Sequence, residues 1–86
     1  MKTISNEVMN ANTATIEGRQ LVANACEKFY MEIEEDIHNA GCDWMLKGMY
    51  NDLCNGNFAE PFLCENKKET LAACVDIYNT RILSRL

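Results

Sequence analysis

Hydrophobic residues recur along this 86-residue chain at the three- and four-residue spacings that place side chains on one side of an α-helix. The longest such stripe lies between Thr15 and Asn39 and predicts a long first helix. Thr15 or a polar residue shortly before it can cap the start, Gly18 is expected to be a weak point, and Gly41 can end the helix in a left-handed conformation. The stripe consists of Val22, Cys26, Phe29, Ile33, Ile37 and Ala40.

A second stripe near the end of the sequence predicts the final helix. Asn66, followed three residues later by Glu69, approximates a capping box, in which two side chains bond backbone N–H groups at the helix start. Arg81 and Arg85 stand in the final turns, where positive charge interacts favourably with the helix dipole. The apolar positions of this stripe are Leu71, Cys74, Val75, Tyr78, Ile82 and Leu86.

The remaining segments are less strongly patterned. A helix is predicted over residues 43–54, with Trp44 on the side opposite its apolar face. Pro61 suits the first turn of a further short helix. Residues 1–14 either form a short helix or stay frayed, because apolar positions are spaced for a helix among many Asn and Thr residues.

These patterns together predict an all-α fold, a compact bundle of three to four helices with a long first helix. We expect a single helical domain over residues 1–86, since a chain of this length has room for one modest core. No apolar run alternates with period two, so no strand is expected. The predicted core consists of Val22, Cys26, Phe29, Ile33, Ile37, Leu46, Met49, Leu53, Leu71, Val75, Tyr78 and Ile82.

The composition predicts a cytoplasmic protein that does not bind membranes. The longest apolar run, residues 71–75, is far shorter than the roughly 20 residues of a membrane span, and no apolar signal region follows Lys2. The chain has five cysteines, an odd number, and none of them form a CxxC pair. Reduced thiols are therefore favoured over a disulfide scaffold.

The candidate metal and catalytic residues are few. His38 and Cys42 stand four positions apart, which could offer two zinc ligands on a continuous helix. Gly41 is predicted to interrupt that helix, and His38 lies on the side away from the apolar stripe. We therefore expect no metal and no cofactor. The sequence also lacks a recognisable nucleophile elbow or Gly-rich phosphate loop, so we predict that the protein is not an enzyme.

Charge is distributed unevenly along the chain. The whole formal net charge of −5 falls within residues 29–46, which hold five carboxylates and no Lys or Arg. Acids and bases balance in residues 1–28 and again in residues 47–86. A localised field of one sign changes encounter rates and partner choice. It also argues against direct nucleic-acid binding, because phosphate contacts need a basic surface.

The acidic window contains the candidate partner-binding residues. Glu32, Glu35 and Asp36 share a polar arc beside the core stripe, and Asp43 and Trp44 follow the helix end. An exposed aromatic residue next to carboxylates has the composition of a protein interface. Two alternatives stay open. The acidic arc could be an ordinary solvated face, and Trp44 could fold back to cover the helix end. If the arc binds a partner, replacing its three acids by Lys is expected to weaken binding and to leave the fold intact.

In size, acidity and helical content the chain is similar to small inhibitors and immunity factors of phages and mobile elements. Some of these proteins block nucleic-acid-handling enzymes, such as CRISPR effectors, by covering a basic surface. The resemblance and the acidic arc imply a small non-enzymatic protein that inhibits or regulates a larger protein partner with a basic surface. The alternative is a self-associating structural or assembly protein, a homo-oligomer in which Ile77 and Leu83, off the main stripe, contact a second copy. These two residues could equally complete the core of the bundle.

Overall fold

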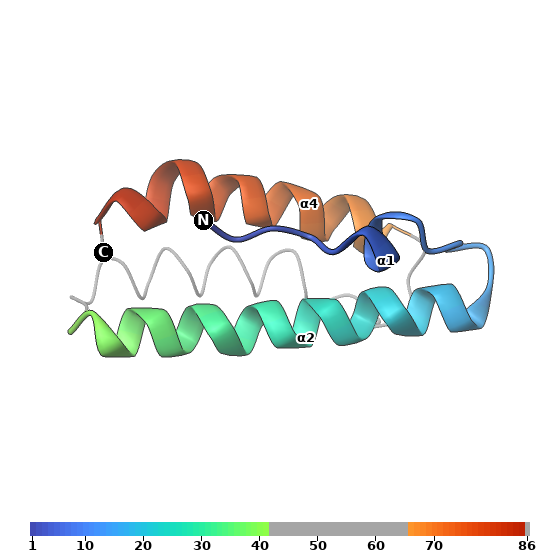
Figure 1. The fold of residues 1–86 in the computed structure, drawn as a ribbon, viewed down its shortest axis with the longest axis horizontal. Helices are drawn as coiled ribbons and strands as arrows, with labels where there is room; N and C mark the ends of the chain where they lie inside the picture. Colours follow the sequence, from blue (N-terminus) through green and yellow to red (C-terminus); the bar gives the residue numbers. More distant parts are fainter. Residues whose placement is uncertain (42–65, 86) are drawn as a thin grey trace.

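The computed structural model describes residues 1–41 and 66–85, and this part of the chain is built from helices (Figure 1). No strand occurs in either range, which confirms the all-α prediction for them. The helices predicted over residues 43–54 and after Pro61 lie outside the described residues. In chain order the elements are α1 (Asn6–Met9), α2 (Ile16–Asn39), α4 (Lys67–Ile77), the π-helical η1 (Tyr78–Ile82) and the 3₁₀ turn η2 (Leu83–Arg85).

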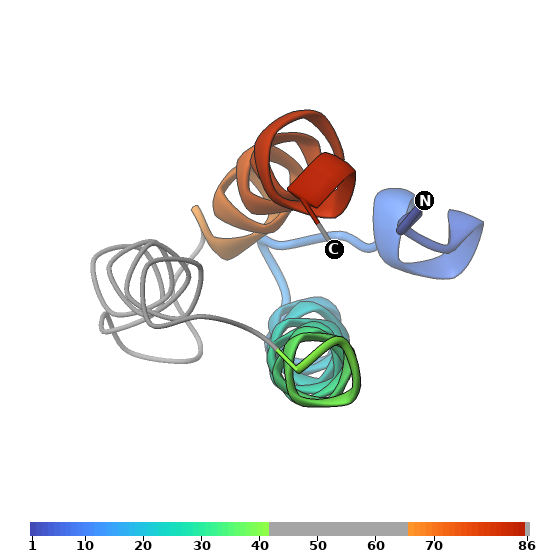
Figure 2. The ribbon, with the colours of Figure 1, turned by 90° about the vertical axis from the view of Figure 1, so that its left-hand side faces the viewer.

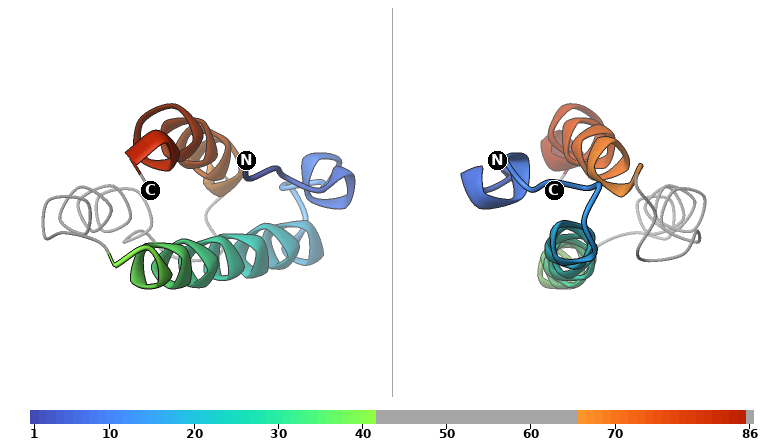
Figure 3. Two further views of the ribbon diagram at one scale, coloured as in Figure 1. Left: turned by 60° about the vertical axis from the view of Figure 1, so that its left-hand side comes forward. Right: turned by 90° about the vertical axis from the view of Figure 1, so that its right-hand side faces the viewer.

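Helices α2 and α4 lie side by side and run in the same direction (Figure 1). The first five residues are extended and lie along one side of this pair, where they run opposite to both helices (Figures 2 and 3). We call this segment the N-terminal strap (residues 1–5). The described core therefore lies between three segments, the two long helices and the strap with α1.

Helix α2 begins and ends as the sequence predicts. Thr15 is its N-cap, with extended backbone angles of −103° and 154°, and its Oγ1 accepts a hydrogen bond from the Gly18 N–H at 3.0 Å. At the other end, the Ala40 N–H bonds the carbonyl of Asp36 at 3.0 Å, and Gly41 has a φ of 65°. A glycine in this left-handed region ends a helix at no steric cost.

The sequence predicts a weak point of the helix at Gly18. A close contact explains why a glycine stands there. It is buried in the first turn of α2, and a Cβ added there would overlap the backbone carbonyl of Asn12. That carbonyl accepts hydrogen bonds from the N–H and the hydroxyl of Thr15, at 3.1 and 2.8 Å. The missing side chain therefore lets the loop between α1 and α2 pack directly on the helix start.

The N-terminal residues form a short helix, the first of the two alternatives. Ser5 caps α1, because its Oγ accepts a hydrogen bond from the Val8 N–H at 3.3 Å. Val8 is buried, and the partly buried Ile4 and Ala11 pack against the same core. These apolar contacts hold the strap and α1 on the helix pair.

Helix α4 departs from the prediction at both ends. Asn66 occupies the N-cap position, but its backbone is helical, at −84° and 0°, and its side chain caps nothing, so the predicted capping box is wrong. A capping side chain reaches the free N–H groups from an extended backbone, which Asn66 lacks. At the other end the backbone widens into a π-helical turn, with the Leu83 N–H bonded to the carbonyl of Tyr78.

The described core follows the two predicted stripes, except that Ala40, the C-cap of α2, is exposed. Ile33, Leu71 and Tyr78 are each at most 2% exposed. Leu46, Met49 and Leu53 were also predicted to be core residues and lie outside the described residues. All other predicted core residues are buried: Val22, Cys26, Phe29, Ile33, Ile37, Leu71, Val75, Tyr78 and Ile82.

Candidate functional site

The predicted partner-binding residues have different environments. Glu35 is exposed to solvent on α2. Glu32 and Asp36 are partly buried and bonded to other parts of the chain. Asp43 and Trp44 lie outside the described residues. Partner binding at these five residues stays a prediction.

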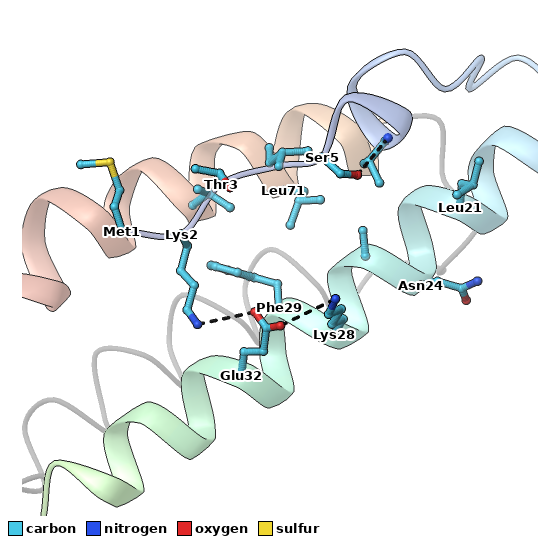
Figure 4. Close-up of a pocket in the computed structure, with 14 residues that line it drawn as sticks. Met1, Lys2, Thr3, Ser5, Leu21, Asn24, Lys28, Phe29, Glu32 and Leu71 are labelled. Atoms are coloured by element: carbon cyan, nitrogen blue, oxygen red, sulfur yellow. Dashed lines mark hydrogen bonds and ion pairs between the residues drawn. The ribbon is translucent and has the colours of Figure 1, made fainter.

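The strap brings the cation of Lys2 to Glu32, as Figure 4 shows, and also to Asp36. Lys2 Nζ lies 3.0 Å from Asp36 Oδ2 and 3.5 Å from Glu32 Oε2. Lys28, one helical turn before Glu32, has its Nζ 3.9 Å from Glu32 Oε1. Burial alone would lower the pKa of Lys2, but the hydrogen bond and charge of Asp36, with those of Glu32, outweigh it and raise the pKa. Part of the predicted acidic arc is therefore neutralised within the chain.

Asp36 also joins α2 to the last helical segment. The phenol of Tyr78 donates a hydrogen bond to Asp36 Oδ2 at 3.1 Å. The Tyr78 ring is fully buried and meets Phe29 edge-on, with ring centres 6.2 Å apart and planes at 86°. Burial, then the charge and hydrogen bond of Asp36, raise the pKa of Tyr78 to about 12. The sequence placed Asp36 away from the core, but it accepts a hydrogen bond from the buried Tyr78, so replacing it by Lys is expected to disturb the fold.

The π-helical turn η1 anchors the backbone of the strap. Asn79 Oδ1 accepts a hydrogen bond from the Lys2 N–H at 2.9 Å, and Asn79 Nδ2 donates one to the Lys2 carbonyl at 2.8 Å. These partners are 77 positions apart, so no local pattern in the sequence indicates the contact. The roles of Lys2 and Asn79 were missed for this reason.

The side of α2 opposite its buried stripe carries carboxylates that no described residue pairs. Glu27, Glu34 and Glu35 are exposed there, and none forms an ion pair within residues 1–41 and 66–85. Met31, which is 63% exposed, is their neighbour on the helix surface because it lies three or four positions from each. We call Glu27, Met31, Glu34, Glu35 and the exposed His38 the outer face. The sequence pattern contained this signal, since Met31 falls outside the core stripe.

The described thiols belong to the core. Cys26 and Cys74 are buried thiols that form no disulfide. Burial raises the pKa of Cys26, and the charge of the buried Lys67 opposes this in part. His38 is exposed, as predicted. In the part of the chain that the structure describes, no three His, Cys, Asp or Glu side chains are grouped so that they could hold a metal ion.

The apolar surface predicted at Ile77 and Leu83 is partly covered by the chain itself. Both residues are half-buried, and Leu83 packs against the core. Leu83 therefore already contributes to the fold of one chain. Self-association through these residues stays a prediction.

Comparisons with family models, with curated proteins and with solved structures find no match to this chain. Among the described helices, none has the length and apolar character needed to cross a membrane. A functional assignment therefore depends on the geometry, charge and exposure of the residues described above.

Proposed function

We propose that this protein is a small, non-enzymatic cytoplasmic binding module that inhibits or regulates a larger protein with a basic surface. The outer face of α2 is the proposed binding surface. One observation carries the proposal: the apolar side chain of Met31 is exposed among Glu27, Glu34 and Glu35, whose charges no described cation offsets. Protein interfaces combine a desolvated anchor with charges that guide the encounter, and this surface offers both.

The carboxylates of α2 do not contribute equally to this surface. Glu35 was predicted as a binding residue, and its exposure supports that role. Glu32 and Asp36 contribute less to the field outside the protein, because Lys2 Nζ lies within 3.5 Å of both. Asp43 and Trp44 are retained in the proposal as an extension of the surface. The predicted bundle of three to four helices would provide the scaffold for this surface.

Self-association through the outer face is the less favoured alternative. In a twofold contact the same patch meets itself, so the outer face with its carboxylates would lie against an equally acidic face of a second copy. Like charges in contact oppose association. A basic partner satisfies the same carboxylates and can still bury Met31. Sedimentation at several protein concentrations distinguishes the two cases, since a tight homo-oligomer would favour the alternative.

The test begins with a tagged pulldown from the native host and identification of the partner by mass spectrometry. Binding kinetics are then measured for a Glu34→Lys, Glu35→Lys double variant. Its association is expected to slow by about tenfold at low salt. The difference should shrink as salt rises, since exposed charges are screened over about 8 Å at physiological ionic strength. Met31→Ala should mainly speed dissociation, as loss of a buried anchor does.

A matched control is available on other parts of the surface. Glu7 on α1 and Asp76 on α4 are exposed, and changing both to Lys alters the net charge by the same amount. This control is expected to slow association much less than the change at Glu34 and Glu35. Equal effects of the two double variants would show that the net charge of the protein, and not the outer face, controls the association rate.

A further inference from the structure

A groove of about 510 Å³ lies between the N-terminal strap and α2 (Figure 4). Its inner wall is apolar and is formed by Phe29, Leu71 and Val75, which are core residues. Leu21 and Ala25 extend this wall along α2. The volume lies within the range of small-molecule sites, which are also lined mainly by apolar side chains with a few polar groups.

The polar groups at the rim include two lysines, on a protein that is acidic overall. Lys2 and Lys28 line the groove with one carboxylate, Glu32, so its lining carries a formal charge of +1 (two minus one), whereas the whole chain carries −5. Lys2 is engaged by Asp36 at 3.0 Å. The Lys28 side chain is 78% exposed, and its contact with Glu32, at 3.9 Å, is long. Such an exposed pair is weak, so Lys28 is free to turn toward another anion.

We propose that this groove binds a small anionic amphiphile, a free alkyl carboxylate of medium chain length. Its chain lies along the half-buried Leu21 and Ala25, and its carboxylate pairs with Lys28 at the rim. A flexible alkyl chain fits a wall of aliphatic side chains, and each methylene that it buries strengthens binding by up to about fourfold. This activity goes beyond the proposed protein binding and does not depend on it.

The experiment is a titration of the full chain with decanoate, below its micelle concentration, followed by amide chemical shifts in NMR spectra. Saturable shifts are expected at Leu21 and Ala25. Octanoate, which is two methylenes shorter, should bind more weakly, and decanol, which lacks the charge, should bind more weakly than decanoate. Butyrate, whose chain is too short to cover the wall, should not produce saturable shifts in the same range.

Two variants test the role of the charge. Lys28→Gln is expected to weaken decanoate binding by about fivefold, the upper range for an exposed ion pair, and to leave decanol binding unchanged. Arg81→Gln removes the same charge from an exposed position on η1, outside the groove lining, and should leave decanoate binding unchanged. Both positions are exposed, so thermal melts should show intact folding in each variant.

The proposal is wrong if decanoate produces no saturable shifts in the groove, or if they lie on the outer face around Met31. It is also wrong if Lys28→Gln and Arg81→Gln bind decanoate equally well. No protein partner enters this experiment, so a negative result would leave the proposed function untouched.

Discussion

The phenol of Tyr78 and the carboxylate of Asp36, 42 positions apart in the sequence, share a hydrogen bond of 3.1 Å that ties the last helical segment to α2. Lys2 Nζ contacts the same oxygen, Asp36 Oδ2, at 3.0 Å. One carboxylate therefore joins α2, η1 and the strap. Asp36, which the charge pattern predicted to bind a partner, therefore also helps to hold the fold together.

Tyr78→Phe tests this hydrogen bond because it removes the hydroxyl and keeps the ring against Phe29. We expect the free energy of unfolding, measured by urea denaturation, to fall by about 1.5–3 kcal/mol, the range for a hydrogen bond to a charged group. A double-mutant cycle with Asp36→Ala, which removes the acceptor, isolates the pair. A coupling energy near zero would contradict the assignment.

The raised pKa of Tyr78 predicts a loss of stability in alkaline solution. Folding raises this pKa from the ordinary value of 10.0 to about 12, so between these values the folded chain keeps a proton that the unfolded chain has lost. The resulting stability is fully present below about pH 10 and is lost as the pH rises through about 12. Urea denaturation across this interval should show a shallower decline for Tyr78→Phe than for the unchanged chain. Equal declines would count against the prediction.

Gly18→Ala tests the close contact at the start of α2. Alanine normally stabilises a helix relative to glycine, but here the added Cβ would overlap the Asn12 carbonyl. We expect a loss of about 1–3 kcal/mol, typical of overpacking, in the free energy of unfolding. Asn24→Ala, at an exposed position of the same helix, should change it by less than about 0.5 kcal/mol. A stabilised Gly18→Ala variant would show that the loop can move away.

Leu71→Ala tests the core where α4 meets the rest of the fold. Leu71 is 2% exposed, so truncation leaves a cavity and should cost about 2–5 kcal/mol in chemical denaturation. Met31→Ala removes an exposed side chain of similar size and should cost little. A loss below about 1 kcal/mol for Leu71→Ala would mean that this part of the core is not closed.

The sequence predicted best those features that depend on neighbouring positions. The stripes through Phe29 and Leu71 and the end of α2 at Gly41 were predicted correctly, because helical periodicity and glycine conformation are local properties. The environment of Asp36 was not predicted. Its partners Lys2 and Tyr78 come from distant parts of the chain, and no periodic pattern encodes their meeting.

Other errors had different physical causes. The capping box at Asn66 failed because its motif assumes an extended backbone, whereas this residue is already helical. The close approach at Gly18 is a tertiary contact that a glycine in a helix does not reveal. The outer face was predicted only in part, because the charge pattern does not mark the uncharged Met31. Its position outside the apolar stripe already indicated that it is exposed.

The paired hydrogen bonds between Lys2 and Asn79 imply an order of events during folding. They close a loop of 77 positions, and such long closure costs more chain entropy than the turns within α2. Lys2 is synthesised 77 positions before Asn79, so the backbone of the strap must wait for the intervening segment before this contact can form. We therefore expect docking of the strap to be a late step of folding, and its release an early step of unfolding.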